Sequence, residues 1–319
     1  MNAASTTGAR YRDALPQLSR SPFLTDGGIE TTLIFHDGLD LPHFAAYDLL
    51  TREGGEDALR RYFEPYVAVA RERGVGILLE TPTWRANPDW AELLGHGPEE
   101  LAELNRRAVG LVEAVRAGQE TGETPIVISG CIGPRGDGYV VGEAMSAEEA
   151  EAYHALQIGT FAETAVDLVS AITMTYADEA VGIVRAAQAV GLPVVISFTV
   201  ETDGRLPSGQ PLREAIEEVD ARTDGVVAYF MVNCAHPSHF YDVLEPGTGW
   251  TDRICGLRAN ASRMSHAELD EAEELDEGDP EELANEYVAL RERLPRLTVL
   301  GGCCGTDHRH IAAMSAAWH

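Results

Sequence analysis

Two adjacent cysteines, Cys303 and Cys304, lie in the glycine-rich turn that follows an apolar run at 297–300. Neighbouring side chains on a regular strand point to opposite faces, so the two sulfurs meet only where the backbone leaves strand geometry. The flanking residues Gly302 and Gly305 permit that departure, because glycine reaches backbone conformations closed to other residues. The pair therefore outlines a site for a soft metal ion.

A third cysteine, Cys234, follows another apolar run. Three thiolates suit zinc, and a catalytic zinc keeps its fourth position open. The alternative is packing, since a free cysteine is usually a small buried hydrophobe, and this is the default interpretation for Cys131 and Cys255. We predict that Cys234, Cys303 and Cys304 bind Zn²⁺.

The composition indicates in which cellular compartment the protein works and which classes of partner it can bind. The cysteine count is five, an odd number, and no hydrophobic signal segment precedes them, so we expect a reduced, cytoplasmic protein whose thiols are available for metal. No apolar run approaches the ~20 residues that span a bilayer, so no membrane partner is expected. The net charge is −28 and would repel a nucleic-acid backbone. Small molecules are the expected partners, and a homo-oligomer remains open.

Short apolar runs recur along the chain and alternate with helical patterns. Examples are 57–73 and the segment that begins at Ser146, where the sequence matches a capping box. Such strands, separated by helices, indicate parallel strands buried on both faces. Eight of them favour a (β/α)8 TIM barrel, of α/β class, over an open sheet. The eight runs are 22–25, 75–79, 125–128, 166–172, 192–196, 226–232, 253–257 and 297–300.

The predicted domain organisation is an N-terminal extension containing a helix at 1–20 and a single barrel domain at 21–319. In such barrels the loops after the strands build the active site. Cys234 leaves the sixth strand, and the pair at 303–304 leaves the eighth. The barrel therefore predicts that the three sulfurs meet over its mouth. The acidic stretch 267–286 is expected to be an exposed loop followed by a helix that begins at Pro280.

Four motifs along the chain resemble the homocysteine S-methyltransferase family, which includes betaine-dependent and S-methylmethionine-dependent enzymes. Together they span nearly the whole barrel, and the last is the most specific. They are Asp26-Gly27-Gly28 with Glu30-Thr31-Thr32-Leu33, Glu80-Thr81 with Asn87, Asn233-Cys234, and Gly301-Gly302-Cys303-Cys304-Gly305-Thr306.

The resemblance implies that the three cysteines hold zinc and that the homocysteine thiol takes the open position. The enzyme would then move a methyl group from a sulfonium or quaternary ammonium donor to homocysteine, giving methionine. For the amino-acid end of homocysteine the family suggests Asp26 with the backbone of Gly27, and we add Glu80 and Thr81 on the next strand. A turn or cap role is the alternative for Asp26.

A cationic donor needs a cation-friendly pocket, which aromatic faces usually provide. Packing is the alternative role for any one of these rings. The candidates near predicted loops are Phe35, Trp84, Tyr139, Tyr176 and Phe198, with Glu30 or Glu201 as charge partners.

The chain departs from the family after the fourth strand, where a Glu that is associated with the substrate ammonium is replaced by Ile172, followed by Thr173. The resemblance therefore supports methyl transfer better than it identifies the acceptor. Methyl transfer to another thiol or a selenol stays open, as do a zinc hydrolase and a barrel with structural zinc. A structural site needs a fourth protein ligand, for which His236 and His308 are the candidates.

Overall fold

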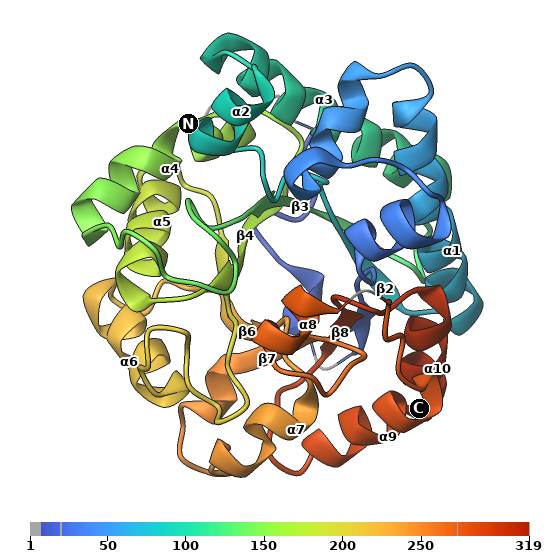
Figure 1. Ribbon diagram of the computed structural model, residues 1–319. Helices are drawn as coiled ribbons and strands as arrows, with labels where there is room; N and C mark the ends of the chain where they lie inside the picture. Colours follow the sequence, from blue (N-terminus) through green and yellow to red (C-terminus); the bar gives the residue numbers. More distant parts are fainter. Residues whose placement is uncertain (1–7, 20, 273, 319) are drawn as a thin grey trace.

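Eight parallel strands form a closed barrel in the computed structural model, which describes residues 8–19, 21–272 and 274–318. Each strand pairs with the next along the chain, and the last returns to the first (Figure 1). This confirms the predicted (β/α)8 barrel. The strands are β1 (Phe23–Leu24), β2 (Gly76–Glu80), β3 (Ile126–Ile132), β4 (Leu168–Met174), β5 (Val194–Phe198), β6 (Tyr229–Asn233), β7 (Ile254–Ala259) and β8 (Val299–Gly302).

Most helices surround the barrel in a ring, while α8 lies over its end (Figure 1). The helices are α1 (Gly55–Arg73), α2 (Pro88–Leu94), α3 (Pro98–Gln119), α4 (Ala147–Ala162), α5 (Ala177–Ala189), α6 (Leu212–Arg222), α7 (Pro237–Phe240), α8 (His266–Glu271), α9 (Pro280–Leu290) and α10 (His308–Trp318). A π-helical segment covers Thr31–His36, and short 3-10 helices cover Pro16–Leu18, Pro42–Phe44, Ala46–Thr51, Tyr241–Val243 and Thr251–Arg253. No described helix is both long and apolar enough to cross a membrane.

Most predicted strands begin too early and end too early. The apolar run at 226–232 becomes a strand at Tyr229–Asn233, for example, because the run begins in the connection that leads to the barrel, where Val226 is still exposed. Polar residues that were expected to follow strands lie within them instead. Glu80 is the last residue of β2 and is in register with Ser129. The ladder therefore carries polar side chains up to the barrel mouth.

The barrel interior is filled by large side chains opposite glycines. A Cβ atom on Gly76 would lie 2.2 Å from the ring of Phe23, and one on Gly256 would lie 2.5 Å from the sulfur of Met231. These glycines leave room for two bulky side chains in the barrel core. A second and larger apolar core lies between the strands and the surrounding helices, as in other barrels of this class.

Two sequence expectations need correction. The described part of the N-terminal extension, 8–19, contains no α-helix, only a 3-10 turn at Pro16–Leu18. Residues 1–7 and 20 lie outside the described part, and the boundary between extension and barrel stays a prediction. The acidic stretch is also not simply a loop: Ser265 and Glu268 form a capping box that starts α8.

A buried carboxylate, that of Asp167 just before β4, is one of the groups that attach the extension to the barrel. It accepts hydrogen bonds from the backbone N–H groups of Arg10 and Tyr11, at 2.7 and 2.8 Å. It also accepts the N–H of Ile128 and pairs with the guanidinium of Arg116, both at 2.9 Å. Arg116 and Asp167 are both almost fully buried, so each depends on the other for its charge balance.

Replacing Asp167 with alanine leaves the Arg116 guanidinium buried without its counter-charge. We expect Asp167→Ala to lower the free energy of unfolding by about 3–5 kcal/mol. Urea denaturation measures this, with Glu56→Ala as the control. Glu56 pairs with Arg60 at an exposed site, so its loss should cost less than about 1 kcal/mol. Equal losses in the two variants would contradict this account.

Candidate metal and substrate site

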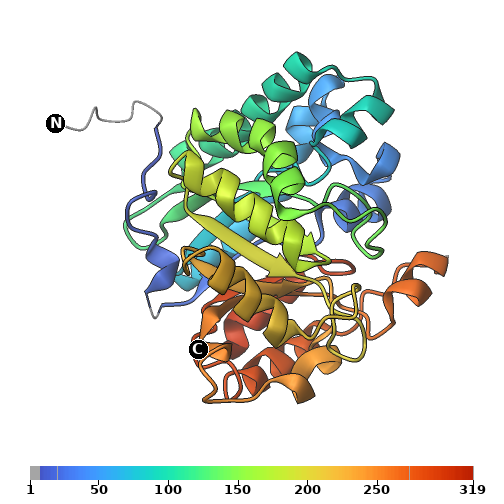
Figure 2. The ribbon, with the colours of Figure 1, turned by 90° about the vertical axis from the view of Figure 1, so that its left-hand side faces the viewer.

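The sulfurs of Cys234, Cys303 and Cys304 all lie within 4.8 Å of one another. The Cys234 and Cys304 sulfurs are 3.8 Å apart. They reach this position from β6 and β8, on the side of the barrel toward which the strands run (Figures 1 and 2). Three sulfurs at this spacing form a soft donor set that suits zinc.

The backbone leaves strand geometry at both cysteine positions. Cys234 has a φ angle of 52°, in the left-handed region that non-glycine residues seldom adopt. Its carbonyl oxygen lies 2.6 Å from Nε2 of His266, whose Nδ1 lies 3.0 Å from Glu201. After β8 the turn closes through Gly305, which has a φ angle of 78°. The sequence predicted the departure from strand geometry after β8 but not the one at Cys234.

The three thiols are coupled through their protons. Hydrogen bonds from the Cys234 and Cys303 thiols hold the pKa of Cys304 well below its usual range. Hydrogen bonds of the Cys234 thiol with Cys303 and with Cys304, together with burial, raise the pKa of Cys234. The cluster therefore favours one shared thiolate, and metal binding would displace the remaining protons because thiolates are the ligating form.

A cavity of about 350 Å³ opens beside the three cysteines. The four residues predicted to bind the substrate line it: Asp26, Gly27, Glu80 and Thr81. Figure 2 shows that the strands run toward the side on which α8 lies. Residues of α8 and of the loop after it also line the cavity, among them Leu269 and Asp276.

Two carboxylates and a guanidinium meet at the floor of the cavity. Nη2 of Arg258 lies 2.7 Å from Asp26, which also accepts a hydrogen bond from Tyr62 at 2.8 Å. Nη1 of Arg258 lies 3.9 Å from Glu80, and neither oxygen of Glu80 has a hydrogen-bond partner among the described residues. Burial raises the pKa of Glu80 to about 7, although Arg258 opposes the shift.

The hydroxyl of Thr81 is already used by the protein. It accepts the backbone N–H of Cys131 at 2.9 Å and shares a 2.6 Å hydrogen bond with Thr83. Cys131 lines the cavity and is buried, but it lies outside the group of three sulfurs. Cys255 packs inside the barrel core, in agreement with its default interpretation.

The aromatic candidates divide into two groups. Phe35, Trp84 and Tyr139 line the cavity, and the Tyr139 hydroxyl lies 3.4 Å from the sulfur of Cys304. Tyr176 and Phe198 do not line it, and the latter stacks on a neighbouring ring in the core. Glu30 lines the cavity, and burial raises its pKa to about 7.

The end of β4 supplies no carboxylate to the cavity. Ile172 and Thr173 occupy that position, and Thr173 has a φ angle of 66°. The amide of Asn233 holds the strand end in this conformation: its oxygen accepts the Thr173 N–H, and its NH2 group donates to the Thr173 hydroxyl. Ser197 donates to the same amide oxygen at 2.6 Å. The nearby Glu179 lies on α5 and faces His154.

The comparisons with known proteins agree with this architecture. The family model described as homocysteine S-methyltransferase matches residues 23–318. The chain belongs to the homocysteine S-methyltransferase family. A sequence search of curated proteins found no match.

Among solved structures, this family member is similar to the homocysteine methyltransferase MmuM from Escherichia coli. Its oxidized form has a TM-score of 0.74 at 20% identity, covering 95% of this chain and 98% of that one. Its metallated form has a TM-score of 0.70 at 19% identity, covering 94% and 97%. At these identities the likeness supports the fold, while the family match shows that the protein is a methyltransferase.

Sequence reasoning missed two arginines at the site of this family member. Arg258 is the only charged residue in β7, and a charge in a strand buried on both faces is the signal that could have revealed it. Arg85 follows β2, is 5% exposed and lines the cavity. It was overlooked because it stands in a loop, where an arginine is ordinarily solvated.

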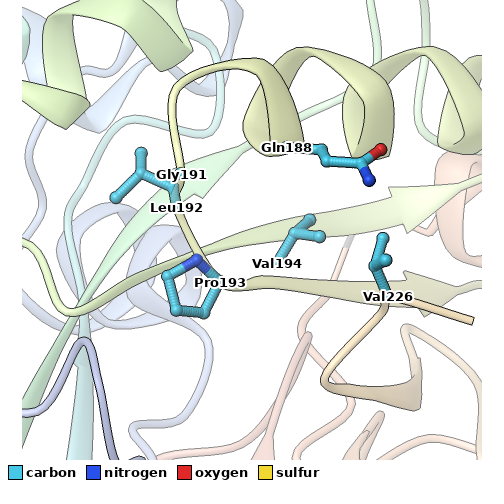
Figure 3. Close-up of a pocket in the computed structure, with 6 residues that line it drawn as sticks. All are labelled: Gln188, Gly191, Leu192, Pro193, Val194 and Val226. Carbon is cyan, nitrogen blue, oxygen red and sulfur yellow. The ribbon is translucent and has the colours of Figure 1, made fainter.

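A second, smaller hollow of about 210 Å³ lies at the opposite end of the barrel strands (Figure 3). It is formed where Leu192 and Pro193 lead into β5 and Val226 precedes β6. Gln188 supplies the one polar side chain among its lining residues. This lining offers no nucleophile or titratable group, so the chemistry belongs to the cysteine-lined cavity.

The raised pKa of Glu80 predicts a pH-dependent stability. The folded protein holds a proton on Glu80 up to about pH 7, whereas the unfolded chain releases it near ~4.3. Stability that this proton supplies is therefore present at low pH and lost as the pH rises through 7. Glu80→Gln removes the titration, so its stability relative to wild type should rise by about 2–3 kcal/mol between pH 5 and 9. Urea denaturation at each pH measures this, and a difference independent of pH would contradict it.

Proposed function

We propose that this methyltransferase is zinc-dependent and that Cys234, Cys303 and Cys304 hold the metal. The observation that carries the proposal is the gathering of three sulfurs within 4.8 Å at the cavity wall. Bound there, zinc would supply the charge that keeps the homocysteine thiol ionised at neutral pH, where the free thiol is mostly protonated.

The methyl transfer itself is a direct displacement. The lone pair of the homocysteine sulfur forms the new S–CH3 bond, and the donor's bond from carbon to sulfur or nitrogen breaks. Its electron pair remains with the leaving group, which departs neutral because the donor was a cation. The thiol proton is released on binding, and methionine is the product.

The protein's own contribution to this step is orientation and exclusion of water. We propose that Asp26 and Glu80 bind the acceptor ammonium, with the backbone of Gly27 taking its carboxylate and Thr81 shaping the wall beside them. The unpartnered oxygens of Glu80 support this role, since a buried carboxylate without a hydrogen bond is costly until a cation arrives. Glu80 thus offers a carboxylate that β4 does not.

The lining of the cavity also supports a cationic donor. Glu30, Asp137, Asp270 and Asp276 are part of this lining, and Tyr139 presents its hydroxyl end to the sulfurs. Carboxylates and aromatic faces stabilise a sulfonium or quaternary ammonium group. Donor and acceptor are both small molecules. A reducing compartment such as the cytoplasm suits the proposal, because three thiols so close together would pair under oxidising conditions.

The alternatives fit the site less well. A structural zinc needs a fourth protein ligand, and the group of described residues that contains the three cysteines includes no histidine. His236 instead lies 3.2 Å from Glu286, and His308 is exposed. A hydrolase is disfavoured because three thiolates donate so much charge that a bound water becomes a poorer acid.

Replacing one cysteine tests the proposal. We expect Cys303→Ala to lose zinc and to lower methyl transfer to homocysteine by more than about a hundredfold. Mutating a residue that only hydrogen-bonds to a metal ligand typically costs about tenfold to a hundredfold, and losing the ligand itself should cost more. Elemental analysis and a methyltransferase assay measure the two effects, and circular dichroism checks the fold.

The matched control is Cys255→Ala, because Cys255 is a buried cysteine of the barrel core outside the sulfur cluster. It should keep both metal and activity. Full methyl transfer by Cys303→Ala, or equal loss of zinc in the two variants, would refute the assignment.

A further inference from the structure

The backbone carbonyl of Cys234 leaves the ladder between β6 and β7. The N–H of Cys234 still donates to the carbonyl of Arg258 at 3.1 Å. A regular parallel ladder would continue with a bond from the N–H of Asn260 to the Cys234 carbonyl. That N–H donates to the carbonyl of Ala235 at 3.2 Å instead. The left-handed backbone at Cys234 therefore directs its carbonyl to a partner outside the sheet.

The partner is the imidazole of His266, a side chain that is 4% exposed. Its Nε2 lies 2.6 Å from the Cys234 carbonyl oxygen. Because a carbonyl oxygen can only accept, Nε2 carries the proton and donates it. Nδ1 lies 3.0 Å from Glu201, and the ring stacks on Tyr139 with centroids 4.1 Å apart and 15° between the planes. Contacts at both ring nitrogens and on one face thus fix the imidazole.

His266 belongs to the segment that covers the cavity. It is the first residue of α8, whose start the capping box of Ser265 and Glu268 fixes. This helix lies over the end of the barrel (Figure 1), and Leu269 and Asp270 on it line the cavity. One side chain therefore joins the cover of the cavity to the backbone of a predicted metal ligand.

We propose that His266 is a positioning residue that couples α8 to the metal site. It holds the left-handed backbone of Cys234, and with it the direction of the Cys234 sulfur, because such a conformation persists only where its surroundings support it. The ligand set is then complete only while α8 covers the cavity. This inference rests on the proposed zinc site and adds the way in which that site is regulated.

His239 provides a matched control. It is also a buried histidine, 8% exposed, and its Nε2 lies 2.9 Å from a backbone carbonyl, that of Arg263. That carbonyl belongs to the connection between β7 and α8 and to no predicted metal ligand. Replacing His239 removes a hydrogen bond of the same kind but leaves the Cys234 carbonyl held by His266.

The first test measures the zinc dissociation constant by competition with a chelator. His266→Phe keeps a ring that can stack on Tyr139 but has no donor, and should weaken zinc binding by about tenfold to a hundredfold. His266→Gln loses the ring but keeps an N–H for the Cys234 carbonyl, so it should recover most of the affinity. His239→Phe should bind zinc like wild type. Circular dichroism checks that each variant folds.

The two His266 variants separate positioning from packing, because a packing role predicts the opposite order. If the ring served only to fill space, His266→Phe would bind zinc like wild type and His266→Gln would be the weaker binder. That order, or an equal loss of affinity in His239→Phe, would overturn the proposal.

The second test uses the reciprocity of coupled sites. If α8 supports zinc binding, bound zinc must in turn stabilise α8. Hydrogen exchange followed by mass spectrometry should show that zinc slows amide exchange in α8 of wild type, and that saturating zinc has a smaller effect in His266→Phe. Exchange in α8 that zinc leaves unchanged in wild type, or slows equally in the variant, would overturn the coupling.

These measurements distinguish the positioning role from the proposed function. Zinc binding that depends on His266, in a protein whose methyl transfer needs no zinc, would support the positioning role and refute zinc-dependent catalysis. Methyl transfer that requires zinc, with an affinity that does not depend on His266, would refute the positioning role alone.

Discussion

The site depends on bringing sulfurs from two separate strands to one point at the barrel mouth. The side chains of two adjacent cysteines on a regular strand point to opposite faces of the sheet. A cysteine that follows β6 must likewise leave strand geometry to face the other two. The structure meets this constraint with a left-handed backbone at Cys234 and a glycine turn at Gly305. The hydrogen bond between the Cys234 carbonyl and His266 helps hold the strained residue, since such conformations persist only where their surroundings support them.

Charge in the cavity is arranged around this point. Asp26 and Glu80 share one guanidinium, that of Arg258, which leaves an excess of negative charge on the floor. Burial raises the pKa of Glu80, and the charge of Asp26 adds to the rise. Arg85 adds a second buried cation, held between two indole rings.

Much of this was predictable from the sequence, for definite reasons. Eight buried strands leave apolar runs that alternate with helical patterns, so the barrel could be recognised without knowing any contact. The meeting of the three cysteines could be predicted because the carboxyl ends of all strands in such a barrel lie at the same face. The capping box at Ser146 also fixed the start of α4 correctly, since it is a purely local signal.

The parts that could not be predicted depend on packing across the barrel. The roles of Arg258 and Arg85 follow from which side chains surround them. A charge within a buried strand marks Arg258 as unusual without giving its partners, and no local pattern marks Arg85. The position of α8 beside the cavity was missed because a strongly acidic segment resembles a solvated loop, although Ser265 and Glu268 carried the capping signal. Strand ends were misplaced because polar residues such as Glu80 continue the ladder into the mouth.

The most direct test of the central claim is zinc X-ray absorption spectroscopy of the purified protein, with and without homocysteine. The account predicts three sulfurs at about 2.3 Å and one lighter atom before addition, and a fourth sulfur at a similar distance afterwards. A zinc shell that homocysteine leaves unchanged, or a protein that takes up no zinc, would contradict the claim that three cysteines hold a metal with room for the substrate thiol.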